Sequence, residues 1–240
     1  MTEKERLYYM EYNISDKLKV MKPSAIREIF EYAKVRKAEI GAENVFDFSI
    51  GNPSVASPNI VNETLIKLIN EKEATSLHGY TSAAGDLNVR KQIARYLNEL
   101  YNVESQESLI YLTVGAAASL TISLSAISED KGEVIVLAPF FPEYTVFINQ
   151  AGMTPVIVKC REEDFQIDFD ALKSAINENT KAVIVNSPNN PSGVVLSEDT
   201  IKKLSSVLSE AEKTYGKDIY IIADEPYREL CYDGIVAPFI

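Results

Sequence analysis

The feature that most constrains the fold is an alternation of short apolar runs with helical segments, which begins at residue 109. The apolar runs are rich in β-branched residues, as expected for strands, and read LIYLT from 109, EVIVLA from 133, TPVIVK from 154, KAVIVN from 181 and IYIIAD from 219. Apolar residues at helical spacing lie between them, over 116–128, 142–150, 168–177 and 197–215. Strands and helices that alternate in this way form crossover units. We therefore predict an α/β fold whose mostly parallel sheet is sandwiched by helices.

The part of the chain before residue 109 has a mainly helical pattern. Apolar spacing predicts one helix between Pro23 and Gly41, a second that opens at Ser57, and a third from Val89 to Leu100. A further run typical of a strand, VFDFSI, starts at residue 45.

Charge and composition exclude several classes of partner. The 24 Lys and Arg residues against 35 Asp and Glu give a net charge of -11, so the surface repels nucleic acid and anionic membranes. Cys160 and Cys231 lie far apart in the chain and His78 is the single histidine, which argues against disulfide frameworks and metal sites. The longest apolar run, 134–141, is broken by Pro139. We therefore expect no signal peptide or membrane span, and a cytoplasmic protein.

The loops after four predicted strands carry the candidate functional residues, because ligands of open parallel sheets bind at the carboxyl ends of the strands. Read alone, each loop has an ordinary explanation. VGAAAS at 114–119 fits a tight turn into a helix, Phe141 and Tyr144 fit core aromatics, NNPSG at 189–193 contains turn formers, and Asp224 fits a helix cap. The nucleotide-binding pattern GxxxxGK[ST] is absent from the sequence.

Taken together and in this order, the loops resemble those of a known family. The most specific pair is Asn-Pro-Ser-Gly at 190–193 and Asp-Glu-Pro-Tyr at 224–227, separated by one helix and one strand. Gly51-Asn52-Pro53 and the stretch from Tyr80 to Arg90 match earlier landmarks. The chain thus resembles the class I aminotransferases, which are pyridoxal 5'-phosphate enzymes of fold type I, over nearly all of its length. The resemblance implies a fold type I large domain with pyridoxal 5'-phosphate as its cofactor.

The resemblance also assigns roles to individual residues. Asp224 matches the carboxylate that pairs with the ring nitrogen of the cofactor, where a negative charge keeps that nitrogen protonated. Asn190 and Tyr227 match donors to the phenolic oxygen of the ring. Phe141 matches the aromatic residue that stacks on the ring, at a position where many relatives have tryptophan. Asp224 and Tyr227 are the catalytic candidates within this chain.

The phosphate of the cofactor and the substrate have matching residues as well. The turn Gly115-Ala116-Ala117 matches the phosphate site, where free backbone N–H groups at a helix start favour an anion. Tyr80 matches a tyrosine that reaches the phosphate of the neighbouring subunit, which implies a homodimer with shared active sites. Gly51 and Asn190 match contacts to the carboxylate of the substrate.

One departure from the family concerns the lysine that bonds the cofactor covalently. In the family it lies downstream of the Asp-x-x-Tyr motif, and no lysine follows Asp224 in this sequence. We expect the chain to be the front part of an aminotransferase, inactive by itself and without the C-terminal small domain. Residues 1–45 are expected to pack with that small domain. Residues 46–240 are expected to form the large cofactor-binding domain, incomplete at its C-terminal end.

For the intact protein, the resemblance implies an aminotransferase that moves an amino group between an L-amino acid and a 2-oxo acid. Two alternatives stay open at this point. One is a carbon–sulfur lyase or cyclase on the same fold, and the other is a non-catalytic module that binds pyridoxal phosphate. The sequence does not name the substrate amino acid.

Overall fold

The computed structural model describes residues 25–51 and 55–240, and the chain divides into two compact units, Met1–Tyr80 and Thr81–Ile240. Asn52 and Pro53, which belong to one of the matched landmarks, lie outside the described residues. The division of the chain near residue 45 stays a prediction.

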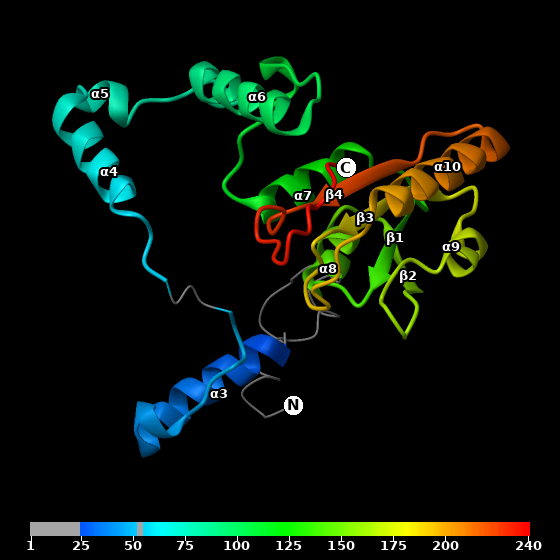
Figure 1. The fold of residues 1–240 in the computed structure, drawn as a ribbon, viewed down its shortest axis with the longest axis horizontal. Coiled ribbons are helices and arrows are strands. Elements are labelled where there is room, and N and C mark those ends of the chain that lie inside the picture. Colours follow the sequence, from blue (N-terminus) through cyan, green and yellow to red (C-terminus); the bar gives the residue numbers. More distant parts are fainter. Residues whose placement is uncertain (1–24, 52–54) are drawn as a thin grey trace, which may run out of the picture. The chain divides into compact units, whose positions relative to one another are not determined.

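The second unit is built on a sheet of four parallel strands, drawn from green to orange in Figure 1. The strands are β1 (Glu133–Ala138), β2 (Thr154–Lys159), β3 (Thr180–Asn186) and β4 (Tyr220–Asp224). Their order in the sheet is β2-β1-β3-β4, and every neighbouring pair is parallel. The central strands β1 and β3 are buried on both faces, which explains their nearly continuous apolar sequences.

Helices cover both faces of this sheet. They are α7 (Ala116–Ala126), α8 (Glu143–Gln150), α9 (Phe169–Ala175) and α10 (Glu198–Tyr215). Side chains of α7 and α8 pack in one cluster with Val134 and Val136, whereas those of α9 and α10 pack in another with Ile135 and Leu137. This split follows from the alternation of side chains along β1. The parallel sheet flanked by helices confirms the predicted fold class.

Short polar side chains fix where several helices begin. The Asp86 carboxylate accepts the N–H groups of Asn88 and Val89 at the start of α6 (Leu87–Tyr101). Asp168 and Ser197 cap α9 and α10 in the same way. These caps satisfy N–H groups that the first turn of a helix leaves free. A short 3-10 helix, η2 (Glu107–Leu109), follows α6.

The first unit is helical over its described residues. It contains α3 (Ala25–Ile40), the 3-10 helix η1 (Ala42–Asn44), α4 (Asn59–Glu71) and α5 (Ala74–Leu77). The helices predicted to start after Pro23 and at Ser57 are therefore confirmed. Many large apolar side chains of α3 and α4 are exposed, and none of the residues of α4 is buried.

Two of the predicted strands are wrong. Residues 45–50 and 109–113 form no strand, although both runs have strand-like composition. Phe48 is 92% exposed and Tyr111 is exposed as well. A strand needs hydrogen-bonded neighbours, and neither run pairs with another segment of the sheet in the structure.

Neither a membrane-spanning helix nor a cluster of metal-binding side chains occurs in the part of the chain that the structure describes. Over 25–51 and 55–240, no helix combines the length and apolar character needed to cross a membrane. The same residues hold no group of three or more His, Cys, Asp or Glu side chains arranged to bind a metal ion.

Candidate active site

A helix start forms one wall of the candidate site. Gly115 precedes α7 with φ 94° and ψ 167°, a backbone conformation open essentially to glycine alone. Its carbonyl accepts the N–H groups of Ala118 and Ser119, at 3.1 and 3.3 Å. No side chain caps this end of the helix. The first backbone N–H groups of α7, together with the positive end of its dipole, therefore remain available to an anion.

The carboxyl ends of β3 and β4 meet at the same edge of the sheet. Asn186 and Asp224 are register partners, and the Asn186 Nδ2 donates to the backbone oxygen of Asp224 at 2.7 Å. The Oδ1 of Asn186 accepts the backbone N–H of Asn190, also at 2.7 Å. One side chain thus ties the loop after β3 to the end of β4.

A second contact joins the two loops at their side chains. The Asn190 Nδ2 lies 3.2 Å from the Tyr227 hydroxyl oxygen and donates to it. Asn190 is exposed and Tyr227 is half-buried. The contact brings together the two neutral donors that the sequence assigned to one ligand atom.

The side chain of Tyr144, in the first turn of α8, also reaches the carboxyl end of β4. It is 1% exposed, and its hydroxyl donates to Oδ2 of Asp224 at 2.5 Å. The ring of Phe141 meets the Tyr144 ring edge to face, with centroids 5.7 Å apart. Burial is the main cause that raises the pKa of Tyr144, and the hydrogen bond to Asp224 adds to it. The phenol therefore keeps its proton at neutral pH.

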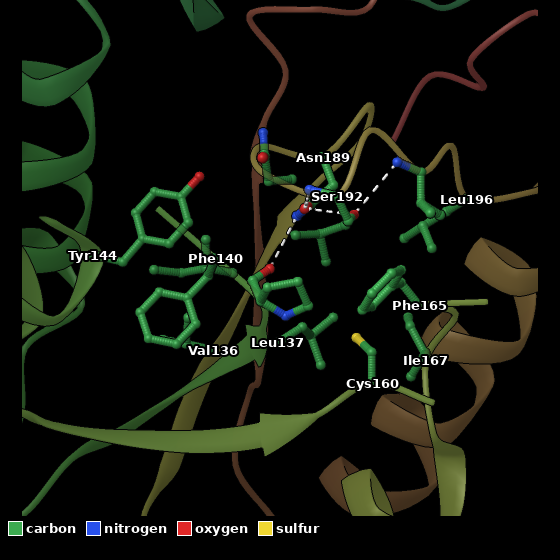
Figure 2. Close-up of a pocket in the computed structure, with 15 residues that line it drawn as sticks. Val136, Leu137, Phe140, Tyr144, Cys160, Phe165, Ile167, Asn189, Ser192 and Leu196 are labelled. Carbon is green, nitrogen blue, oxygen red and sulfur yellow. Dashed lines mark hydrogen bonds between the residues drawn. The ribbon is translucent and has the colours of Figure 1, made fainter. Parts of the chain in front are cut away.

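These groups surround a cavity of about 150 Å³. Its lining is Ala116, Ala117, Leu120, Phe141, Tyr144, Phe147, Asn186, Asn190, Asp224, Pro226 and Tyr227. A second cavity of about 20 Å³ lies beside it and shares Tyr144 and Asn186. Figure 2 shows Tyr144 and Phe140 on one side of this smaller cavity and Cys160, Phe165 and Ile167 on the other. A volume of that size holds about one water, so of these two cavities the larger one is the one with room for a small organic ligand.

Six of the nine residues assigned to a site from the sequence line the larger cavity: Ala116, Ala117, Phe141, Asn190, Asp224 and Tyr227. Gly115 stands next to it as the residue before α7. Gly51 and Tyr80 belong to the first unit, where both are exposed, and their roles stay predictions.

Sequence reasoning missed two residues that organise this site, Tyr144 and Asn186. The sequence pattern predicts a core aromatic for Tyr144 and the last residue of a strand for Asn186. A signal for Asn186 existed, because a polar side chain at the carboxyl end of a buried parallel strand lies at the ligand-binding edge.

The second unit is an α/β domain whose candidate ligand site lies at the carboxyl ends of the strands of a parallel sheet. The cavity offers free N–H groups for an anion, an aromatic wall, two neutral donors and one carboxylate. That set of groups suits an aromatic ligand that carries both an anionic group and a basic ring atom.

Comparison with known proteins identifies the family. The model of the family "Aminotransferase class I and II" matches residues 43–238, and the chain belongs to this family. The enzymes of this family depend on pyridoxal 5'-phosphate, which confirms the cofactor expected from the sequence.

Curated relatives include two proteins of Bacillus subtilis (strain 168). The chain is 30% identical to a probable N-acetyl-LL-diaminopimelate aminotransferase over 226 residues, which covers 93% of this chain and 53% of the relative. It is 31% identical to an aspartate aminotransferase, with 84% and 49% covered. The chain spans about half the length of the curated relatives it matches.

Solved structures give the same result. An amino transferase from Eubacterium rectale is 51% identical, with a TM-score of 0.88 over 100% of this chain and 58% of that one. The aspartate aminotransferase of Thermus thermophilus with maleate is 28% identical, with a TM-score of 0.83 over 94% and 56%. Family membership and the fold type I architecture are therefore established.

Proposed function

We propose that the intact protein is an aminotransferase that moves an amino group between an L-amino acid and a 2-oxo acid, with pyridoxal 5'-phosphate as cofactor. One observation carries the proposal: in a chain of this family, Asp224, the Asn190–Tyr227 pair and the start of α7 line one cavity. The donor set fits the cofactor group by group.

The chain's own residues would hold the cofactor as follows. The N–H groups of Ala116 and Ala117 would bind its phosphate, and Phe141 would stack on its ring. Asn190 and Tyr227 would donate to the phenolic oxygen, and Asp224 would face the ring nitrogen. When bound, pyridoxal phosphate supplies an electron sink for a carbanion at the amino carbon. The negative charge of Asp224 favours the protonated ring nitrogen on which this chemistry depends.

The remaining assignments belong to the same proposal. Gly51 would contact the substrate carboxylate together with Asn190, and Tyr80 would serve the phosphate of a second copy in a homodimer. A cytoplasmic location in amino acid metabolism, including biosynthesis, fits the two free cysteines, Cys160 and Cys231. The relatives named for aspartate support an acidic amino acid as the first substrate to test.

The first part of the test is a titration of the purified chain with pyridoxal 5'-phosphate. The absorption and fluorescence of the cofactor report how much of it is bound. Because hydrogen bonds to charged groups contribute about 1.5–3 kcal/mol, Asp224→Ala is expected to weaken binding about tenfold or more. Asp218→Asn, an exposed change just before β4, is the matched control and is expected to have no effect. Equal affinity of the wild-type and Asp224→Ala chains would contradict the proposed site.

The second part of the test concerns the reaction. The protein translated from the whole reading frame is supplied with L-amino acids and 2-oxoglutarate, and glutamate formation is measured. Amino transfer supports the proposal. Release of ammonia without an acceptor would favour a lyase instead, and cofactor binding without either reaction would favour a non-catalytic module.

A further inference from the structure

We propose that Tyr144 is a positioning residue for the cofactor: its hydroxyl fixes the Asp224 carboxylate so that the second oxygen of that group is held for the ring nitrogen of pyridoxal phosphate. The inference rests on the proposed function and gives a role to Tyr144, for which the sequence pattern alone predicts only a place in the core. Two observations support this inference. The Tyr144 hydroxyl contacts one particular oxygen of the Asp224 carboxylate, and neighbouring aromatic rings hold the Tyr144 ring in place.

The Asp224 carboxylate has one hydrogen-bond partner among the described residues, the Tyr144 hydroxyl on Oδ2. Asn186 contacts the backbone oxygen of Asp224 and not its carboxylate. The second carboxylate oxygen is therefore left to the cavity that Asp224 lines. A carboxylate with one oxygen fixed by a donor cannot turn freely about its side-chain bonds.

The ring of Tyr144 is fixed in turn by its neighbours. Phe141 packs against it edge to face, and Phe140 lies parallel to it with centroids 6.4 Å apart. The backbone N–H of Tyr144 donates to the Phe141 oxygen at 3.1 Å, which anchors the first turn of α8. With its position set by burial and packing, the phenol presents its hydroxyl to Asp224 in one orientation.

The hydroxyl also remains a donor over the working range of pH. Burial raises the pKa of Tyr144, and the neighbouring Asp224 raises it further. The Tyr144–Asp224 contact therefore pairs a neutral donor with a carboxylate, and it does not neutralise the charge that the ring nitrogen needs.

The experiment is a double-mutant cycle read by cofactor affinity. Pyridoxal phosphate is titrated into the wild-type chain, Tyr144→Phe, Asp224→Ala and the double variant. Tyr144→Phe keeps the ring and removes the hydroxyl, and it is expected to weaken binding about tenfold. In the Asp224→Ala background the same change is expected to have an effect of less than about twofold, because no carboxylate remains to be positioned.

A second ligand separates positioning from general damage to the fold. The analogue in which carbon replaces the ring nitrogen is expected to bind Tyr144→Phe and wild type with equal affinity. Both titrations use the same preparation, so the ratio of the two affinities does not depend on the folded fraction. Tyr96→Phe is the matched control, since the Tyr96 hydroxyl donates to a different carboxylate, that of Glu229. It is expected to leave both affinities unchanged.

The outcomes are distinguishable. Equal weakening of both ligands by Tyr144→Phe would overturn the inference, because the loss would not pass through the ring nitrogen. Unchanged pyridoxal phosphate affinity in Tyr144→Phe, with loss in Asp224→Ala, would overturn the inference and leave the proposed function standing. Unchanged affinity in Asp224→Ala would overturn the proposed function and the inference with it.

Discussion

Phe141 forms the aromatic wall of the cavity and gives the first prediction at the scale of single residues. Phe141→Leu keeps an apolar side chain but removes the ring face. Since aromatic stacking contributes about 0.5–1.5 kcal/mol beyond buried area, pyridoxal phosphate is expected to bind about fivefold more weakly. Phe169→Leu, on the opposite face of the sheet, is the control with unchanged affinity. Equal losses in both variants, measured by cofactor fluorescence, would contradict a stacking role.

Asp47 gives a pH prediction within the first unit. Lys37 Nζ lies 2.8 Å from Oδ2, and the Ser49 hydroxyl donates to Oδ1 at 2.6 Å. With Lys37 as the largest cause, these contacts lower the pKa of Asp47 from 3.8 to about 2. The charged contact is therefore complete above pH 3.8 and is lost as the pH falls through about 2.

Lys37→Ala is expected to move the titration midpoint of Asp47 upward, toward 3.8 but not to it, because Ser49 still donates to the carboxylate. Carbon-detected NMR of labelled aspartate measures this shift. Arg36→Ala, which removes the partner of Glu39, should leave the midpoint in place. A midpoint unchanged in Lys37→Ala would show that the ion pair does not form in solution.

The residues that the sequence predicted differ from Tyr144 in one physical respect. Asn190, Asp224 and Tyr227 stand in short local patterns that mark them as site candidates. Tyr144 acquires its role from a hydrogen bond to a residue 80 positions away. A buried tyrosine has the same local pattern whether its hydroxyl meets a carboxylate or a water, so only the fold identifies its partner.

The turn into α7 gives a prediction at the scale of elements. A side chain at Gly115 would meet no atom within 4 Å, so the cost of substitution lies in the backbone conformation alone. Gly115→Ala is expected to lower the free energy of unfolding by about 1–3 kcal/mol and to weaken pyridoxal phosphate more than pyridoxal, which lacks the phosphate. Urea unfolding and titration with both ligands measure this.

Gly216, at the end of α10, is the matched control for Gly115. It also has a positive φ of 66° and open space, but in the left-handed helical region, where alanine costs about 1 kcal/mol. Gly216→Ala should therefore lower stability less and leave both affinities unchanged. Similar losses of phosphate-dependent binding in the two variants would exclude a specific role for the α7 turn.

Elements were predictable where the sequence pattern and the tertiary contacts agree. EVIVLA and KAVIVN become β1 and β3, whose buried faces both require apolar residues. LIYLT has a similar composition, yet Leu109 lies in η2 and the rest forms no strand. Strand formation depends on a neighbour to pair with, and composition carries no information about that neighbour.

For the protein as a whole, the exposed apolar side chains of α4 give a prediction about self-association. Ile60, Leu65, Ile66 and Ile69 are all exposed in the chain by itself. If the proposed homodimer forms through α4, a second copy is expected to cover these residues. Leu65→Glu is expected to weaken self-association about tenfold or more, since burying a leucine contributes about 1.5–3 kcal/mol. Sedimentation velocity with saturating cofactor measures the change.

Thr64→Glu is the control for that prediction. It adds the same charge to α4 one position away, in place of a residue that is already polar. It is expected to leave the association constant within about twofold of the wild-type value. A chain that sediments as a monomer at every concentration, with or without cofactor, would contradict the homodimer in this form.

The buried centre of the sheet has a consequence for amide hydrogen exchange. β1 and β3 each have a hydrogen-bonded strand on both sides and four consecutive buried residues. Their amide hydrogens can therefore exchange only when the second unit unfolds globally. They should exchange slowest, whereas amides of α4, which buries no residue, should exchange within the first time points. Added cofactor should slow exchange in 187–193 and 225–228 and leave β1 almost unchanged. A ligand that binds at the ends of the strands protects the loops there, because the strands themselves already approach the protection limit set by global unfolding.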